Sequence, residues 1–399
     1  FCHSGRQRPL WRRRSPVSCA ASRFTASGVC ALHRSGPDGE RCHCFPGVVA
    51  VQHQRRPELE HPAHECVCRW VSGASALSRH AAAVCASCAL QRPLRSANLP
   101  WVSGAAPYGN QQGFIASWIS DNQDGSGSGI YAQSFSSSGI PIGAEFRVNT
   151  TTANTQYFPD LTQLSGGRFL ITWQSEYQDG SSWGIYGQLF NADGTISGTE
   201  FRINSTTNDQ QIEPVVAALA DGGFVVSWMS ASQDGSSWGV YAQRYDATGA
   251  KAGNETRINT VTDGEQHSPT IAVLADGSYV IAYQGANHPG GSGWDIYAQR
   301  FSATGSKLGG EIRLNDAALG NGQYEPAIAP LANGGYVATW QDDGRDGSSW
   351  GIYARAFAAD GTPAAAEFRV NTMTNDQQGE PEVAVLADGS FVISWHSYN

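Results

Sequence analysis

The chain has 399 residues and a formal net charge of −9 at neutral pH. The charge is divided unevenly, because residues 1–100 carry +9 and the remaining residues carry −18. An acidic main part argues against nucleic acid as a partner, since phosphates would be repelled. No apolar run approaches the roughly 18 residues that a membrane-spanning helix needs, so no membrane insertion is expected.

Residues 1–108 differ from the rest and are predicted to be irregular or disordered. They hold all nine cysteines, between Cys2 and Cys88, and residues 1–100 contain no Ile, Tyr, Lys or Met. VCALHR and VCASCA begin 55 residues apart, which is the period of the array described below. The hypothesis is an out-of-frame reading of further repeats, with the correct frame resuming near Gly109. A zinc module, for which only Cys85 and Cys88 have the right spacing, and a basic nucleic-acid-binding segment are the alternatives.

Residues 109–399 are predicted to form a tandem β-repeat domain of about five units, truncated at the C-terminus. Self-similarity at a fixed period indicates a repeat architecture. The FRVN-like element recurs with spacings of 55, 55, 56 and 56, at Phe146, Phe201, Thr256, Ile312 and Phe368. We expect both natural termini to be missing, because the chain starts without Met and stops inside a repeat.

Each unit reads as four short strands. In residues 211–266, QIEPVVAALA alternates apolar residues, and the turn at Asp221-Gly222-Gly223 leads into FVVSWM. WGVYAQRYD and NETRIN follow as the third and fourth strands. Four antiparallel strands per 55 residues favour an all-β, β-propeller-like array of four-stranded blades. A string of sandwich or solenoid modules is the alternative.

The loop between the second and third strands carries acids in most units. Calcium takes six to eight oxygens from carboxylates and loop carbonyls, which a Gly-rich acidic loop supplies. The alternative is that Asp-Gly forms the turn and Ser-Ser caps it. The candidate calcium ligands are Asp121, Asp124, Glu176, Asp179, Asp234, Asp342, Asp343 and Asp346.

Other positions recur once per unit, and for each a structural role stands beside a functional one. The tryptophans at 183, 238, 294 and 350 either pack between blades or form a ring for stacking on sugars. The Arg of the fourth strand, as in Arg202, is expected to pair with a loop Asp of the neighbouring unit. The Gln-x-x-Pro element, as in Gln211 to Pro214, marks the start of the first strand and is expected to be structural.

Catalytic residues are expected to break the symmetry of the repeats, because one unit must hold groups that the others lack. The singular residues are His267, His288, His396, Arg345 and the Asp342/Asp343 pair. None forms a Ser-His-Asp or metal-ligand arrangement in the sequence. No catalytic residue is therefore predicted.

The array resembles the tandem repeats of large secreted bacterial proteins of the RTX or haemolysin-type calcium-binding group. The resemblance rests on EFRVNT, LADGGF, QDGSSWGIYAQRF-like and ADG elements over residues 109–399. It implies a secreted or cell-surface location and a calcium-rich setting, although the calcium-binding nonapeptide of that group is absent from this chain.

The predicted function is a non-enzymatic extracellular module with a binding, structural or adhesive role, calcium as its candidate cofactor, and carbohydrate or protein ligands. The alternative is a propeller-type polysaccharide hydrolase or lyase with its active site on the axis. Three or more acids from different units that converge on the central channel, together with a sugar-sized pocket, would favour the hydrolase.

Overall fold

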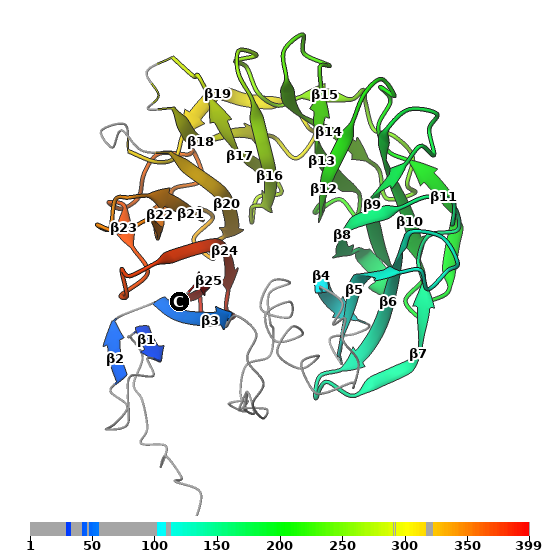
Figure 1. Ribbon diagram of the computed structural model, residues 1–399, viewed down its shortest axis with the longest axis horizontal. Coiled ribbons are helices and arrows are strands. Elements are labelled where there is room, and N and C mark those ends of the chain that lie inside the picture. The colour runs from blue at the N-terminus through cyan, green and yellow to red at the C-terminus, as the bar shows by residue number, and fades with distance from the viewer. Residues whose placement is uncertain are drawn as a thin grey trace, which may run out of the picture.

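The computed structural model describes residues 113–398, apart from 290, 292 and 317–321, and the strand segments 29–32, 42–45, 48–55 and 102–108. In this part the chain folds into successive antiparallel sheets, which are arranged around a common axis like the blades of a propeller (Figure 1). The first strands of successive blades lie side by side and are innermost. The predicted all-β array of four-stranded blades is therefore confirmed.

Five blades have four strands each in the described part of the chain, and one 3-10 turn, η1, spans Ser165–Gly167. Blade 1 consists of β4 (Val102–Tyr108), β5 (Gly113–Asp121), β6 (Ser128–Ser136) and β7 (Pro141–Arg147). Blade 2 consists of β8 (Gln156–Gln163), β9 (Phe169–Glu176), β10 (Trp183–Phe190) and β11 (Ile196–Arg202). Blade 3 consists of β12 (Gln211–Ala218), β13 (Phe224–Ala231), β14 (Trp238–Tyr245) and β15 (Thr256–Arg257).

Blade 4 consists of β16 (Gln266–Val273), β17 (Tyr279–Ala286), β18 (Trp294–Phe301) and β19 (Lys307–Arg313). Blade 5 consists of β20 (Gln323–Pro330), β21 (Tyr336–Asp343), β22 (Trp350–Phe357) and β23 (Phe368–Arg369). The outermost strand of blades 3 and 5 is shortened to two residues, whereas it has seven in blades 1, 2 and 4.

A sixth sheet completes the described part of the array. It begins with β24 (Gln377–Val385) and β25 (Phe391–Tyr398), and continues with β3 (Val48–Arg55), β1 (Val29–Leu32) and β2 (Cys42–Phe45). β3 runs parallel to β25, where the other blades have an antiparallel third strand. The boundary predicted near residue 109 follows β4 directly, and the out-of-frame origin of residues 1–108 stays a prediction.

The hairpin between the first two strands is set by glycine. In blade 3, Gly222 has a φ of +87°, which glycine adopts without steric cost. A Cβ at Gly223 would lie 2.2 Å from the carbonyl oxygen of Tyr245, so only glycine fits there. The Leu219 N–H donates to the Gly223 carbonyl at 2.8 Å and closes the turn that the sequence predicts.

The core lies between neighbouring blades. One cluster joins Leu170 and Ile185 of blade 2 to Phe224, Val226 and Trp228 of blade 3, all nearly inaccessible to solvent. Each blade also stacks the aromatic ring that begins its second strand on the ring that ends its third strand. The centroid separations are 4.6–5.1 Å for Phe114/Phe135, Phe169/Phe190, Phe224/Tyr245, Tyr279/Phe301 and Tyr336/Phe357.

The repeated tryptophans at the start of the third strand pack between blades. Trp238 of blade 3 lies 6.1 Å from His267 of blade 4, and Trp294 of blade 4 lies 5.8 Å from Tyr324 of blade 5, measured between ring centroids. All four of the predicted tryptophans are half-buried. The inter-blade packing role is confirmed.

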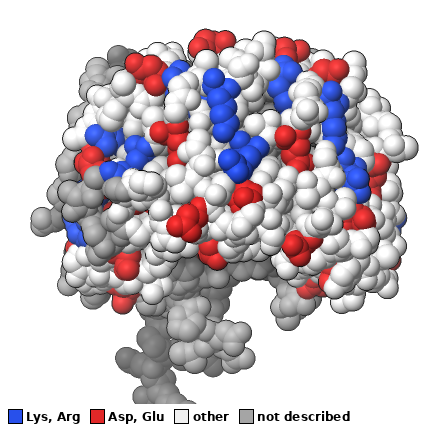
Figure 2. Space-filling view, turned by 90° about the horizontal axis from the view of Figure 1, so that it is seen from above, with Lys and Arg blue, Asp and Glu red and all other residues white. Residues whose placement is uncertain are grey.

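The outer rim carries charges of both signs. Viewed from above, basic and acidic side chains alternate over the blades, and neither sign forms a continuous field on this face (Figure 2). The described residues include no helix with the length and apolar character required to traverse a bilayer.

Candidate active site

Four of the eight predicted calcium ligands hold their own blade together. In blade 3, Asp234 accepts the Ser236 N–H at 3.1 Å through Oδ1 and the Asn259 side-chain N–H at 3.0 Å through Oδ2. Asp124, Asp179 and Asp346 make the same two contacts in blades 1, 2 and 5. These carboxylates therefore form the turn and fix the fourth-strand asparagine.

Blade 4 achieves the same contact by a different route. Its loop has no Asp at this position, and Asp295 stands where the other blades have a glycine at the start of the third strand. A Cβ on the equivalent Gly239 would lie 2.6 Å from Asp234 Oδ2, so the two side chains would compete for one place. Asp295 is fully buried and accepts the Asn315 side-chain N–H at 2.8 Å. Each of these blades therefore has a carboxylate that binds its fourth-strand asparagine.

The asparagine of the fourth strand, rather than the arginine, binds the loop carboxylate, and it does so within its own blade. Arg257 instead donates through Nε to the carbonyl of Asn259 at 3.1 Å. The predicted pairing of this arginine with an Asp of the neighbouring unit is therefore wrong in blade 3. The planar amide of Asn satisfies a backbone N–H and a carboxylate at the same time, which a guanidinium without an acceptor cannot do.

The remaining predicted ligands lie at the ends of second strands. Asp121 accepts the Ser128 hydroxyl at 2.6 Å, and Glu176 is the half-buried last residue of β9. Asp342 is buried 3.6 Å from the Arg345 guanidinium, whereas Asp343 is exposed. Among the described residues, no group of three or more His, Cys, Asp or Glu side chains is placed to hold a metal ion.

Calcium binding by these loops stays a prediction. Calorimetric titration with calcium, together with a thermal melt, tests it directly. The absence of heat and of any change in melting temperature would contradict it.

A different set of acids gathers at the axis, on a bulge that every inner strand shares. Each first strand shifts register against its second strand, as between Ile212 and Val215 of β12. The residue two places after the glutamine of each Gln-x-x-Pro element has a φ of about +50°, which is unusual for any residue except glycine. These bulge residues are Phe158, Glu213, Ser268, Glu325 and Glu380.

The bulges are fixed by the preceding blade. The Gln174 side-chain oxygen of blade 2 accepts the Glu213 N–H at 2.9 Å, and Gln284 of blade 4 accepts the Glu325 N–H at 2.7 Å. Gln341 of blade 5 accepts the Glu380 N–H at 2.9 Å. A backbone conformation that costs free energy is thus held by an inter-blade hydrogen bond.

Five carboxylates from four inner strands form what we call the axial cluster: Asp160, Glu213, Glu325, Glu380 and Glu382. They share one electrostatic environment, because Glu325 acts on Glu213, Glu380 acts on Glu325, and Asp160 and Glu325 act on Glu382. Ser268 donates to Glu325 at 3.4 Å, and His396 Nδ1 lies 2.5 Å from Glu380.

Crowding of like charges and withdrawal from bulk water raise the pKa of several members. Desolvation, with help from Glu325, raises the pKa of Glu213 to about 7. Glu382 is exposed to solvent at the axis, yet the surrounding inner strands desolvate it and raise its pKa to about 7, with Asp160 and Glu325 adding to the effect.

Asp160 has a distinct environment. Desolvation raises its pKa to about 6, while the N–H groups of Val216, at 2.7 Å, and Leu161, at 2.8 Å, favour its ionised form. No hydrogen-bond donor among the described residues reaches the Glu213 carboxylate, which therefore holds a proton more readily. The cluster thus pairs a fixed carboxylate with protonatable ones, which is the arrangement for general acid–base chemistry near neutral pH.

Sequence reasoning missed the axial cluster, although a signal for it was present. Gln and Pro of the Gln-x-x-Pro element recur in every unit. The Gln is buried and structural, since Gln211 accepts the side-chain N–H of Asn204 at 3.0 Å. The residue just before the proline varies from unit to unit. A variable position between two constant ones, turned toward the axis, is the broken symmetry expected of an active site.

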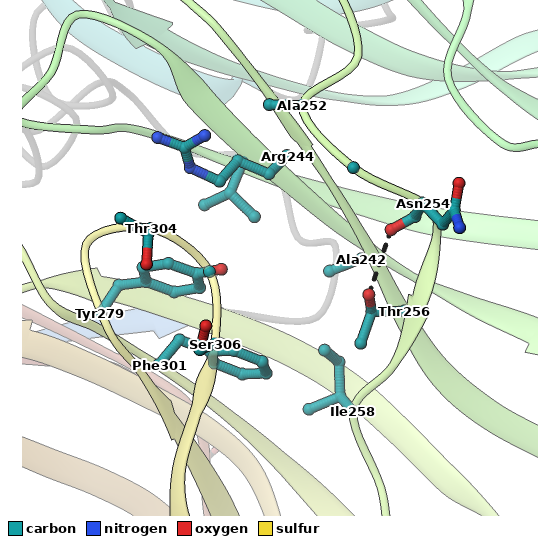
Figure 3. A pocket seen from close by; sticks show the side chains of 13 residues that line it. Ala242, Arg244, Ala252, Asn254, Thr256, Ile258, Tyr279, Phe301, Thr304 and Ser306 are labelled. Atoms are coloured by element: carbon teal, nitrogen blue, oxygen red, sulfur yellow. Dashed lines mark hydrogen bonds between the residues drawn. The ribbon is translucent and has the colours of Figure 1, made fainter.

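A cavity of about 170 Å³ lies elsewhere, at the rim between blades 3 and 4 (Figure 3). Its floor includes the stacked rings of Tyr279 and Phe301, and Thr256 lies on the opposite side. At the equivalent position of blade 2, Phe201 packs 5.8 Å from Tyr245, the counterpart of Phe301. The cavity therefore lies where blade 3 has Thr256 in place of the aromatic ring of blade 2. It is remote from the axial cluster.

Replacing Thr256 by Phe is expected to fill this cavity and stabilise the fold by about 1 kcal/mol. The reverse change in blade 2, Phe201→Thr, is expected to destabilise it by about 3 kcal/mol. Chemical denaturation of both variants measures the two effects. A destabilised Thr256→Phe variant would show that the cavity is not shaped for the repeat's aromatic residue.

No family model and no curated protein matches the sequence. Solved structures share its fold at low identity. One is a protein of unknown function from Dyadobacter fermentans, with 10% identity over 72% of this chain and 91% of that chain and a TM-score of 0.51. An α-L-arabinanase from Penicillium chrysogenum, complexed with arabinobiose, has 15% identity over 74% and 88% and a TM-score of 0.50. An α-L-arabinofuranosidase from Fusarium graminearum has 13% identity over 73% and 84% and a TM-score of 0.47.

These findings correct the family prediction. The resemblance to RTX calcium-binding repeats is wrong, because no family model supports it and the fold is shared with propellers that include an arabinanase. The repeated QDGSSWG and FRVN elements arise from the contacts that each blade needs, as the Asp234–Asn259 bond illustrates. A calcium-rich setting, which followed only from that resemblance, loses its support.

The prediction of a non-enzymatic module is also corrected. It rested on the symmetry of the repeats, and the bulge positions of the inner strands break that symmetry. Acids from four inner strands share one electrostatic environment, which meets the part of the condition for the hydrolase that concerns acids, and the propellers that share this fold include an arabinanase. The sugar-sized pocket that the condition also named stays a prediction.

Proposed function

We propose that the chain is a glycan-cleaving enzyme of propeller fold, with the axial cluster as its active site. The observation that carries the proposal is that the adjacent inner strands β8 and β12 each carry a desolvated acid at the axis, Asp160 and Glu213, with different hydrogen bonding and raised pKa values. Hydrolysis of a glycosidic bond needs two carboxyl groups, one protonated and one ionised.

The environments support a division of roles between the two acids. Glu213, desolvated and without a donor to its carboxylate among the described residues, is proposed to protonate the oxygen of the leaving sugar. Asp160, held ionised by two backbone N–H groups, is proposed to act on the opposite side as the base or nucleophile. Desolvation, together with the charge of Glu325, favours the protonated form of Glu213.

The substrate class is proposed from the fold and the site together. An arabinanase shares the fold and binds arabinobiose, so arabinose-containing polysaccharide is the first substrate to test. No cofactor is needed for this reaction, because both proton transfers use carboxyl groups of the chain. A secreted or cell-surface location remains part of the proposal, since polysaccharides of this kind lie outside the cell.

The test is release of reducing ends from a panel of polysaccharides, with linear arabinan, xylan, pectin and β-glucan assayed side by side. The proposal expects release from at least one member, with arabinan first. Absence of release from every member by folded protein would contradict it.

The pH dependence of cleavage follows from the two pKa values. Because Asp160 must be ionised, kcat/KM is expected to rise as pH increases through about 6. Because Glu213 must be protonated, kcat/KM is expected to fall as pH increases through about 7. We therefore expect a narrow bell-shaped profile of kcat/KM against pH, with its maximum between these two values. A kcat/KM that still rises above neutral pH would show that a group other than Glu213 donates the proton.

A further inference from the structure

Phe158 occupies a position at which neither packing nor backbone conformation favours phenylalanine. Its side chain is 50% exposed, and its φ is +52°. A non-glycine residue in this conformation costs about 1–3 kcal/mol, and an exposed ring recovers little of that cost through burial. The bulge itself is common to all five positions, so the unusual feature at 158 is an exposed aromatic side chain on it.

The register between neighbouring inner strands places Phe158 at the level of two residues of the axial cluster, Asp160 and Glu213. Asp160 of β8 accepts the Val216 N–H of β12 at 2.7 Å, and Thr162 accepts the Ala218 N–H at 3.3 Å. The same offset places Phe158 level with Pro214, next to Glu213. Phe158 therefore lies two residues before Asp160 in its own strand and level with the neighbour of Glu213 in the next strand.

The Phe158 ring is backed by other aromatic side chains. Tyr157 lies 6.1 Å from it at an interplanar angle of 50°, and Trp183 meets Tyr157 edge-on at 6.5 Å, measured between centroids. These contacts restrict the ring without covering it. Of the five equivalent bulge positions only Phe158 is aromatic, while three of the others are Glu.

We infer that Phe158 is the platform on which a sugar ring of the glycan stacks next to Asp160 and Glu213. An aromatic face takes the C–H face of a sugar, and the adjacent carboxylates take its hydroxyl groups, so the ligand class is a glycan with one apolar ring face. This role rests on the proposed function, which it deepens by fixing where the sugar lies. Phe158 is a positioning residue that acts through the placement of the substrate.

The deciding variant is Phe158→Asn, because Asn tolerates a positive φ. We expect its melting temperature to equal or exceed that of the wild type, while KM for linear arabinan rises about tenfold with kcat largely kept. Phe158→Tyr and Phe158→Trp keep an aromatic face and are expected to restore KM. A residue kept for packing would instead lower the melting temperature and leave KM unchanged, which would overturn the inference.

Calorimetric binding of arabinobiose separates this inference from the proposed function. If wild-type protein binds arabinobiose without cleaving arabinan, the proposed function fails, and loss of binding in Phe158→Asn still supports the platform. If wild-type protein cleaves arabinan and Phe158→Asn does so with unchanged KM, the platform is overturned and the proposed function stands. If the wild type neither binds nor cleaves any glycan of the panel, both are overturned.

Discussion

Glu213→Gln is expected to lower kcat for glycan cleavage by about 10²- to 10⁴-fold, with a much smaller change in KM. Gln has the size of Glu but cannot deliver a proton to the leaving oxygen. The bulge that places residue 213 is held by its backbone N–H on Gln174, which the substitution leaves in place. Asp160→Asn is expected to cause a loss of similar size, because an amide cannot act as base or nucleophile.

The matched control is Glu145→Gln, on the exposed outer strand of blade 1. It makes the same chemical change far from the axis and is expected to retain the wild-type rate. Steady-state kinetics on the polysaccharide cleaved best in the panel measure all three variants. Wild-type kcat in Glu213→Gln would exclude this residue as the proton donor.

Asn259→Ala is expected to destabilise the fold by about 3 kcal/mol. Asn259 is fully buried and accepts the Val240 N–H at 3.0 Å. It also donates to Asp234, to the Val261 carbonyl and to Gln266. Truncation leaves these groups buried without a partner, including a carboxylate.

Denaturant unfolding compares Asn259→Ala with Asn254→Ala, an exposed asparagine five residues earlier. The exposed variant is expected to stay within about 0.5 kcal/mol of the wild type. Equal stabilities of the two variants would show that the buried asparagine does not hold the blade together.

The fold follows from the sequence because its determinants are local and repeated. The Asp-Gly-Gly turn at 221–223, the alternation in QIEPVVAALA and the third-strand WGVYAQ each recur in phase, so one unit predicts the others. The strands observed in blade 3 begin at Gln211, Phe224 and Trp238, as the pattern indicates.

The axial cluster did not follow, because it depends on contacts between residues 39 or more positions apart, such as Gln174 with Glu213. Nothing local in the sequence shows that the residue before Pro214 has a positive φ, or that the inner strands bring Asp160 next to Val216. The loop acids were favoured instead because carboxylates near glycine are easily recognised in a sequence. In the structure the loop carboxylates bind the asparagine of their own blade. In blade 4, which lacks the loop Asp, Asp295 binds Asn315 instead.

We propose that a glycan binds among the inner strands and is cleaved there. A crystal structure of Glu213→Gln with arabinobiose tests this most directly, since the variant is expected to bind without cleaving. We expect a sugar ring stacked on Phe158, with the glycosidic oxygen beside residue 213 and Asp160 on the other side of the ring. Arabinobiose bound only at the rim, for example in the cavity beside Thr256, would contradict it.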